Sequence, residues 1–301
     1  MKSKTIIIPI LALLLLAGCS KWNTTEPVGT DTSHPWDRDP QLWEEYWESL
    51  RAYKQRKHSL VYVRFDNAAE KPGSEKNFMR CLPDSLDFVS LTNAGNFSTY
   101  DAEDMQWMRK VGTKVLYQID LSKEVDFGNA IKIVKDNSLD GFSIVGGIKS
   151  GGDKISAALS KLHGNGLLVL EGYPAILTEE EIGKIDLFVL PSERAVNSYS
   201  LSNLIQDALE CGVSRDKILL AASFDGSWYD ESNAEKPVVP SMAENVIKFG
   251  PLAGLALYDI MSDYYHYDGN WLSLRTTISR LNPYNPYAAF GCHFLRPLLG
   301  G

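Results

Sequence analysis

The sequence predicts an α/β fold, a single-domain (βα)8 TIM barrel, from three observations. Short apolar runs recur roughly every 25 to 35 residues, which is typical of strands. Segments with apolar residues at helical spacing lie between these runs, which indicates parallel strands joined by crossover helices. Eight such runs fit within about 220 residues, which is enough for a compact eight-stranded barrel.

Each predicted element follows from its own apolar pattern. The predicted strands are 60–65, 88–91, 114–119, 141–148, 167–170, 187–190, 218–222 and 255–258. The predicted helices between them are 102–111, 129–137, 154–163, 201–211, 242–249 and 271–280. A further helix over 41–57 precedes the first strand, and we expect Trp36, Trp43 and Trp47 to anchor it to the barrel.

An open doubly wound sheet is the alternative architecture. That fold calls for a glycine-rich phosphate loop after an early strand, whereas the first apolar run ends in Phe65-Asp66-Asn67-Ala68. The segment Gly146–Gly152 contains four glycines, but these lack the spacing of a dinucleotide-binding fingerprint. The sequence therefore favours the barrel.

The N-terminus predicts export and lipid anchoring. Lys2 and Lys4 precede an apolar stretch over 6–16, which is too short to span a membrane and is typical of a secretory signal. The stretch closes with Leu-Ala-Gly directly before Cys19, which is the lipobox pattern of bacterial lipoproteins. We expect acyl chains on Cys19 to hold the protein on a membrane surface.

This reading divides the chain into three parts. Residues 1–18 are the predicted lipoprotein signal peptide. Residues 19–40 are polar and rich in Thr, Asp and Pro without an apolar period, and we expect a flexible tether there. Residues 41–301 are the predicted barrel. We expect the protein to lie in the cell envelope, at the outer membrane. The sequence does not decide between the cell surface and the periplasmic face.

Charge and cysteine content exclude several classes of partner. The net charge of −8 disfavours nucleic acid, because an acidic surface repels phosphate backbones. Beyond the lipobox, Cys81, Cys211 and Cys292 form a sparse, odd set that leaves a single disulfide open. His163 and His266 have no partners at metal-ligand spacing, so we expect neither a metal nor a cofactor.

The predicted ligand site follows from the barrel topology. Ligands of TIM barrels meet the carboxyl ends of the strands, where the loops after the strands gather on one face. Polar and aromatic residues collect at these positions, and such a mixture suits carbohydrate, whose hydroxyls need hydrogen bonds and whose ring faces lie against aromatic side chains. The candidate ligand-binding residues are Asp66, Asn93, Gln118, Asp120, Glu171, Tyr173, Asp225, Trp228, Tyr258 and Asp259.

One motif links the barrel to a known family. The segment 140–147 reads Asp-Gly-Phe-Ser-Ile-Val-Gly-Gly and ends the fourth apolar run. In frame, it resembles the Asp-Gly-x-Asp-x-Asp-x-Glu signature of family 18 glycoside hydrolases, the chitinases and endo-β-N-acetylglucosaminidases. Asp140 and the following glycine match this signature. Ser143, Val145 and Gly147 stand where the family carries two further aspartates and the proton-donating glutamate.

The resemblance implies a sugar-binding barrel without the family's chemistry. In that family the acetamido group of the substrate attacks the anomeric carbon, while the glutamate protonates the leaving oxygen. Val145 and Gly147 can supply neither that proton nor the neighbouring carboxylate, so no catalytic residue is expected in the degenerate motif. Gln118, Asp120, Tyr173 and Tyr258 look like the family's sugar-binding positions. Within the family, the chain is similar to lipoproteins of gut Bacteroidetes that accompany outer-membrane glycan importers.

Three functions follow from this reading. The first is a non-catalytic glycan-binding lipoprotein that captures N-acetylglucosamine-containing or mannose-rich oligosaccharides for uptake. The second is an active endo-glycosidase with relocated carboxylates, Glu171 with Asp120 or Asp259. The third is a protein–protein module on an inactive barrel.

Several residues keep structural alternatives. Asp140 is either a turn cap or a ligand contact, and Glu171 is either a relocated acid or an ion-paired loop carboxylate. Asp225 and Trp228 lie in a turn-rich segment that suits either role. The aromatic residues Tyr264, Tyr265, Tyr267 and Trp271 form either an exposed stacking platform or ordinary packing.

Overall fold

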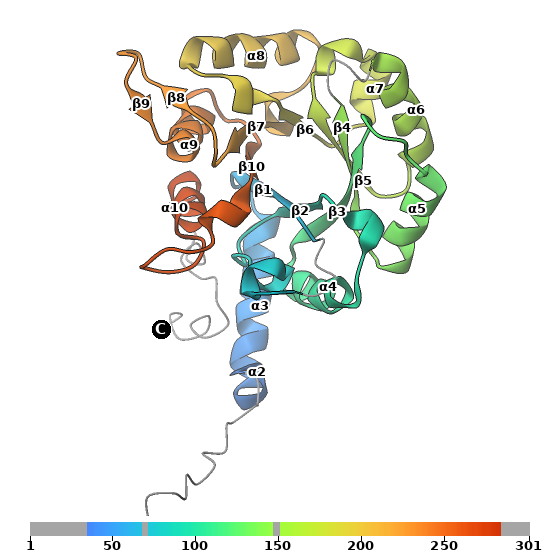
Figure 1. Cartoon of the computed structure of the whole chain (residues 1–301), viewed down its shortest axis with the longest axis vertical. Coiled ribbons are helices and arrows are strands. Elements are labelled where there is room, and N and C mark those ends of the chain that lie inside the picture. The colour runs from blue at the N-terminus through green and yellow to red at the C-terminus, as the bar shows by residue number, and fades with distance from the viewer. Residues whose placement is uncertain (1–34, 68–71, 147–150, 284–301) are drawn as a thin grey trace, which may run out of the picture. The chain divides into compact units, whose positions relative to one another are not determined.

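The computed structural model describes residues 35–67, 72–146 and 151–283. Eight parallel strands close into a barrel in the order β1-β10-β7-β6-β5-β4-β3-β2, with helices around the ring (Figure 1). The predicted (βα)8 TIM barrel is therefore confirmed, and each of the eight predicted strands is present. They are β1 (Leu60–Phe65), β2 (Phe88–Leu91), β3 (Lys114–Asp120), β4 (Gly141–Gly146), β5 (Leu167–Gly172), β6 (Leu187–Leu190), β7 (Ile218–Ser223) and β10 (Gly254–Tyr258).

The seven predicted helices are also present, with ends shifted by a few residues. They are α3 (Pro40–Gln55), α4 (Thr99–Val111), α5 (Phe127–Asp136), α6 (Gly152–Leu162), α8 (Ser198–Glu210), α9 (Val238–Lys248) and α10 (Leu272–Leu281). The periodicity missed the short helix α7 (Glu179–Gly183) and a hairpin after β7, formed by β8 (Trp228–Tyr229) and β9 (Glu235–Lys236). Both elements are too short to show a hydrophobic period.

The predicted signal peptide, Cys19 and residues 19–34 of the predicted tether lie outside the described residues. Within the rest of the tether, Pro35–Arg38 form the short helix α2. Among the described residues, no helix combines the length and apolar character needed to cross a bilayer. Cys292 also lies outside the described residues, so the disulfide stays open.

Helix α3 is held by an aromatic cluster, as the sequence predicted for Trp43 and Trp47. Their rings lie 5.8 Å apart, and both contact Trp107 of α4, at 6.3 and 5.7 Å between ring centroids. Tyr46 donates a hydrogen bond of 2.8 Å to the buried carboxylate of Asp84 in the β1–β2 connection. Burial of three indoles contributes several kcal/mol, so this helix is an integral part of the barrel.

The interior of the barrel changes character along its axis. Inward-facing side chains near the strand starts and middles are apolar, including Leu116, Val169, Leu187 and Leu219, and they form one buried cluster. Nearer the carboxyl ends, the inward positions carry Tyr62, Ser90, Ser143, Glu171 and Tyr258, and all five are buried. Buried polar groups are stable only when they are hydrogen-bonded, so this upper layer must form a satisfied network.

Three aspartates join neighbouring strands at the amino-terminal end of the barrel. Each precedes an even-numbered strand and accepts a hydrogen bond from the backbone N–H of the second residue in the strand before it. The pairs are Asp87 with Val61 (2.8 Å), Asp140 with Val115 (2.9 Å) and Asp186 with Leu168 (2.8 Å). Asp140 also forms an ion pair of 2.8 Å with Lys114. These carboxylates satisfy strand-end donors that the sheet leaves unpaired.

Gly141 of the motif is required by backbone geometry. Its φ is 155°, and a Cβ there would lie 2.1 Å from the carbonyl oxygen of Leu167 on the adjacent strand. Gly254 has the same role before β10, with φ of 159° and a would-be Cβ 1.9 Å from the carbonyl oxygen of Leu60. No side chain fits at either position.

This geometry corrects the placement of Asp140. The sequence interpretation put Asp-Gly at the end of the fourth strand, close to a ligand. The structure places Asp140 before β4, at the opposite end of the barrel from the strand carboxyl ends, where it is one of three equivalent structural carboxylates. The two motif residues that match the family signature are therefore those that the barrel itself needs.

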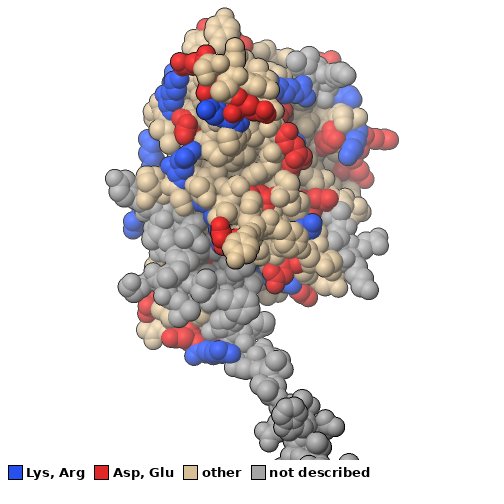
Figure 2. All heavy atoms as spheres, turned by 60° about the vertical axis from the view of Figure 1, so that its left-hand side comes forward, with Lys and Arg blue, Asp and Glu red and all other residues tan. Residues whose placement is uncertain are grey.

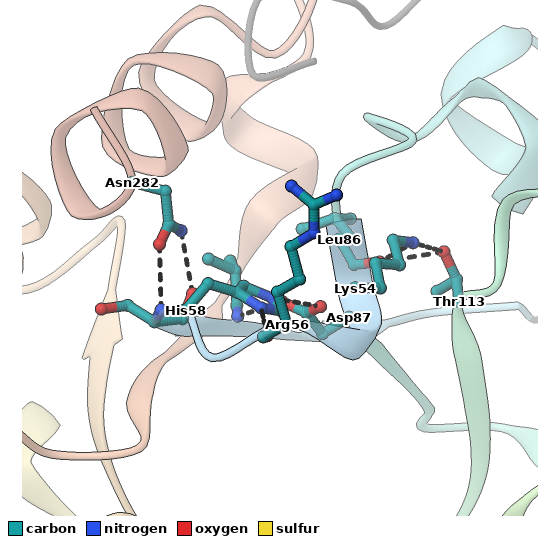
Figure 3. Close-up of polar contacts among 9 residues, drawn as sticks. Lys54, Arg56, His58, Leu86, Asp87, Thr113 and Asn282 are labelled. Atoms are coloured by element: carbon teal, nitrogen blue, oxygen red, sulfur yellow. Dashed lines mark hydrogen bonds and ion pairs between the residues drawn. The ribbon is translucent and has the colours of Figure 1, made fainter. Parts of the chain in front are cut away.

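At the amino-terminal end of the barrel, a polar network joins helix α3, the first strands and the end of α10 (Figure 3). The side chain of Asn282 forms two hydrogen bonds of 2.9 Å with the backbone of Ser59. It accepts one from the N–H and donates the other to the carbonyl. Lys54 donates to the Leu86 carbonyl and the Thr113 hydroxyl, and burial lowers the pKa of Lys54 to about 8 against the attraction of Asp87 and Asp84.

His58 belongs to the same network and lies between two acceptors. Its Nδ1 lies 2.7 Å from the carbonyl oxygen of Arg56, and its Nε2 lies 2.9 Å from Oδ1 of Asp87. Both ring nitrogens must carry protons to satisfy these contacts, so the site selects the imidazolium form. Burial lowers the pKa of His58, but the hydrogen bond and charge of Asp87 outweigh burial and raise it above 6.5.

The raised pKa predicts a pH-dependent contribution to stability. Because the folded state binds the proton more tightly, the His58–Asp87 pair should stabilise the fold fully below about pH 6.5 and lose this contribution as pH rises through the raised pKa. The free energy of unfolding of the native chain minus that of His58→Gln should therefore shrink between pH 5.5 and pH 8.5. Chemical denaturation at several pH values measures this difference.

The matched control is His163→Gln, which replaces an exposed histidine. Its difference from the native chain should stay constant over the same pH range. A difference for His58→Gln that is equally constant would contradict the imidazolium assignment.

Candidate functional site

The centre of the candidate site is Glu171, which points into the barrel from the end of β5 and has a side chain only 1% exposed. Five donors from β1, β3, β4 and β10 surround its carboxylate. They are Tyr62 (2.7 Å), Arg64 Nε (2.7 Å), Gln118 (3.2 Å), Tyr258 (2.8 Å) and the Ser143 hydroxyl. The carboxylate therefore joins four other strands of the barrel to β5.

This environment keeps Glu171 ionised. Burial raises the pKa of the carboxyl, but the charge of Arg64 and the hydrogen bonds from Ser143, Tyr62 and Tyr258 outweigh burial and lower it below its usual value. A carboxylate with a lowered pKa and all its lone pairs occupied has no proton to donate and no open acceptor. This geometry does not suit Glu171 as a relocated acid and favours the ion-paired alternative.

Arg64 links this buried carboxylate to solvent. Its Nε donates to Glu171, and its guanidinium carbon lies 3.6 Å from the centroid of the Tyr258 ring. Burial lowers the pKa of Arg64, but the charge of Glu171 more than compensates and raises it above its ordinary value. The side chain of Arg64 is 28% exposed, so the guanidinium forms part of the surface at the carboxyl end of the barrel.

The degenerate motif lies beside this pair. Ser143 is fully buried and, besides donating to Glu171, accepts a 3.1 Å hydrogen bond from Ser90. Val145 is half-buried and stands in register between Asp120 on β3 and Glu171 on β5. Gly147 lies outside the described residues. Where the family signature has its second and third aspartates, this chain has a hydroxyl that supports Glu171 and an apolar side chain.

Some predicted ligand residues form local contacts around the same rim. Asp120 accepts hydrogen bonds from the backbone and hydroxyl of Ser122, and these lower its pKa against the effect of burial. Asn93 is half-buried and accepts a hydrogen bond of 2.8 Å from Asn96. Asp66 is exposed directly after β1, and Tyr173 is half-buried directly after β5.

Ser223 joins Asp225 and Asp259 at the ends of β7 and β10. The hydroxyl of Ser223 donates to Asp259, and the same oxygen accepts the backbone N–H of Asp225 at 3.2 Å. Asp259 has a left-handed backbone with φ of 56°. Both carboxylates are exposed. The structure therefore brings Glu171, Gln118 and Tyr258 into one network and Asp225 and Asp259 into a second, smaller cluster.

Trp228 does not lie with the other predicted ligand residues, and this corrects its predicted position. The chain continues from β7 into the β8–β9 hairpin, which carries Trp228 onto the flank, where it is 4% exposed. It lines a cleft of about 710 Å³ with residues of α9 and α10, and no other predicted ligand residue lines that cleft. Ion pairs such as Asp230–Lys236 (3.3 Å) lie along it, and acidic and basic side chains are interspersed on this side of the molecule (Figure 2).

Of the aromatic residues after β10, some are buried in packing and others are exposed. Tyr264 and Trp271 are buried with ring centroids 5.0 Å apart, and Trp271 donates to the carbonyl of Cys81. Tyr265 is 67% exposed and Tyr267 is fully exposed. Half of the cluster is packing and the other half is available for stacking.

Two residues outside the predicted ligand set gain importance from the structure. Arg64 is a charged residue at an inward position of an apolar strand, which is itself a signal of function. Glu193 follows β6, and burial raises its pKa against the attraction of Arg194 and Arg64. One carboxyl oxygen of Glu193 is buried without a hydrogen-bond partner among the described residues. Its position after β6 was evident from the sequence, but its desolvation was not.

Among the described residues, no group of three or more His, Cys, Asp or Glu side chains is arranged to hold a metal ion. The ionised centre at Glu171 instead has a guanidinium as its counterion.

The fold and the site are those of a (βα)8 barrel with a polar centre at its carboxyl end, and part of the chain is similar to family 18 glycoside hydrolases. The family model of glycoside hydrolase family 18, BT1044-like, matches residues 25–136 of this chain. This match confirms the resemblance to family 18 that the sequence predicted. No curated protein matches the chain in sequence.

Solved structures share this barrel fold. A BT1044 variant superposes with a TM-score of 0.67 at 20% identity, covering 83% of this chain and 96% of its own. The endo-β-N-acetylglucosaminidase of Cordyceps militaris gives 0.56 at 17% identity, covering 79% and 95%. A chitinase A described as putative, from Streptomyces coelicolor, gives 0.51 at 12%, covering 77% and 96%. At these identities the likeness concerns the fold.

The network around Glu171 predicts a large stability effect of Glu171→Gln. Removal of the charge leaves Arg64 without its counterion, so the free energy of unfolding should fall by about 3 kcal/mol at pH 7. Because the folded pKa is lowered, this difference should be complete above the unfolded value of about 4.3 and should shrink as pH falls through the folded pKa. Urea denaturation between pH 3 and pH 7 measures it.

Glu180→Gln is the control, since Glu180 is an exposed carboxylate paired with Lys184 on α7. Its unfolding midpoint should stay close to that of the native chain. A Glu171→Gln protein as stable as the Glu180→Gln protein at pH 7 would show that Glu171 is not the centre of the network.

Proposed function

We propose that this protein is a non-catalytic glycan-binding lipoprotein of the cell envelope, which captures N-acetylglucosamine-containing or mannose-rich oligosaccharides for uptake. The observation that carries this proposal is that β4 lacks the signature carboxylates and that the nearby carboxylate on β5 has no free acceptor. Ser143 and Val145 replace the signature aspartates, and the carboxylate beside them, Glu171, is ionised and saturated with donors. Glycosidic cleavage needs a carboxyl that can protonate the leaving oxygen, and Glu171 cannot supply it.

The rim of the barrel supports binding. Arg64 and Asp120 supply donors and acceptors at the carboxyl ends of the strands, and Tyr173 is a half-buried aromatic residue at the same rim. Sugars are held by this combination of hydrogen bonds and aromatic faces. Fold relatives include an endo-β-N-acetylglucosaminidase, and that enzyme class acts on glycans containing N-acetylglucosamine.

The place of action follows from Cys19. We propose that lipidation of this residue keeps the barrel at the outer membrane, with the polar segment after it as a tether and a glycan importer as a partner. Metabolic labelling with a fatty-acid analogue should tag the native chain and leave Cys19→Ser untagged.

The central test follows binding and product release in one experiment. The chain carrying Cys19→Ser is incubated with N-glycans and chitooligosaccharides, with binding measured by calorimetry and products by mass spectrometry. We expect binding without cleavage, weakened about tenfold by Tyr173→Ala, which removes an aromatic face at the rim.

Ile247→Ser, at an exposed position near the end of α9, is the control and should bind as the parent does. The absence of binding to every glycan in the panel would refute the proposed function.

One observation favours a second candidate, a slow glycosidase. Glu193 stands at the rim with a raised pKa and a buried, unpartnered carboxyl oxygen, which are properties of a proton donor. Product release that persists in Glu171→Gln and disappears in Glu193→Gln would establish this activity. Release in neither protein leaves glycan capture as the function.

A further inference from the structure

Arg64 presents two unused donor groups at the mouth of the barrel. Its Nε is occupied by Glu171, but its terminal nitrogens, Nη1 and Nη2, donate to no acceptor among the described residues. A guanidinium has five N–H groups in a fixed plane, so four of them are directed at solvent or a ligand. Such a fork matches pairs of oxygen acceptors.

The orientation of this fork is determined by the buried network. The Nε hydrogen bond fixes one edge of the guanidinium, and the Tyr258 ring at 3.6 Å fixes its plane. Glu171 is itself held by Tyr62, Gln118 and other donors, so its carboxylate is a fixed partner for the arginine. A donor that is already ordered loses little entropy when a ligand binds. Glu171 is in this sense a positioning residue for Arg64.

The charge around the fork determines which acceptors it can take. The positive charge of Arg64 is balanced by Glu171 at 2.7 Å. Around it, described residues that end or closely follow the strands supply more carboxylates than cations: Asp66, Asp120, Glu193, Asp225 and Asp259 against Lys123 and Arg194. Both of these cations lie near carboxylates of the same set, Lys123 at 3.6 Å from Asp120 and Arg194 at 3.6 Å from Glu193. An anionic sugar would therefore meet repulsion at the rim.

We propose that Arg64 is the ligand-reading residue of this barrel, and that it binds neutral acceptor oxygens of an oligosaccharide, hydroxyl or amide carbonyl, while the acidic rim excludes sugars that carry carboxylates. This inference rests on the proposed glycan-binding function and adds the chemical class of the ligand. It assigns Glu171 the role of orienting and neutralising the arginine.

The test compares neutral and acidic probes on the full chain carrying Cys19→Ser. The neutral probes are triacetylchitotriose and mannopentaose, and the acidic probe is a hyaluronan tetrasaccharide, which combines N-acetylglucosamine with glucuronate. Calorimetry at low salt should show at least tenfold tighter binding of a neutral probe than of hyaluronan, and the ratio should narrow at 0.5 M NaCl because salt screens the rim.

The decisive variant is Arg64→Lys, which keeps the positive charge beside Glu171 and removes the planar fork. Neutral-probe affinity should fall about tenfold or more, the scale of a lost charge-assisted hydrogen bond. Arg215→Lys is the matched control, since Arg215 is exposed before β7 at the other end of the barrel, and it should bind as the parent does. The double variant Asp120→Asn/Asp259→Asn should gain affinity for hyaluronan.

A second readout follows the arginine side chains of the parent protein directly. In the chain labelled with ¹⁵N-arginine, the side-chain resonances of one arginine should shift on titration with the neutral probe, and Arg64→Lys assigns that signal. Unchanged neutral-probe affinity in Arg64→Lys, or no shifted arginine resonance, would overturn this inference while leaving glycan capture intact. Hyaluronan binding as tight as that of the neutral probes would also overturn it. Failure of the parent to bind either neutral probe would remove the proposed function as well.

Discussion

The packing of the barrel interior near the carboxyl ends of the strands depends on one buried carboxylate. Glu171 sits where a polar layer crosses the interior, and its burial is tolerable only because five donors and the charge of Arg64 compensate for the loss of water. The same contacts order Tyr62 and Tyr258, whose hydroxyls would otherwise be buried without partners. A fully satisfied network of this kind specifies a unique arrangement, while any missing partner would leave a costly unpaired group.

This constraint gives the two ends of the barrel different tasks. At the amino-terminal end, Asp87, Asp140 and Asp186 satisfy strand-end N–H groups, and Gly141 permits close approach of β4 and β5. At the carboxyl end, Asp225 and Asp259 are exposed and the guanidinium of Arg64 reaches solvent. The division explains how a chain can retain Asp-Gly of a catalytic signature without retaining its chemistry, because that dipeptide serves the barrel.

Much of the fold was predictable because it rests on periodicity. Apolar runs such as 60–65 and 187–190 matched strands residue for residue, and the crossover helices followed from their spacing. The candidate site was predictable only as a set of strand ends. The sequence placed Glu171 and Tyr258 on the correct face, but it placed Trp228 there as well. The hairpin that carries Trp228 away has two residues in each strand, too few to leave a pattern.

The sequence by itself determined the barrel, the resemblance to family 18 and the absence of the signature carboxylates, since these are properties of order and residue identity along the chain. Only the tertiary structure decided what the remaining groups do. The lowered pKa of Glu171, the raised pKa of Glu193 and the unused donors of Arg64 arise from burial and from partners on distant strands. Desolvation and hydrogen-bond geometry depend on neighbours in space, which no local pattern of residues records.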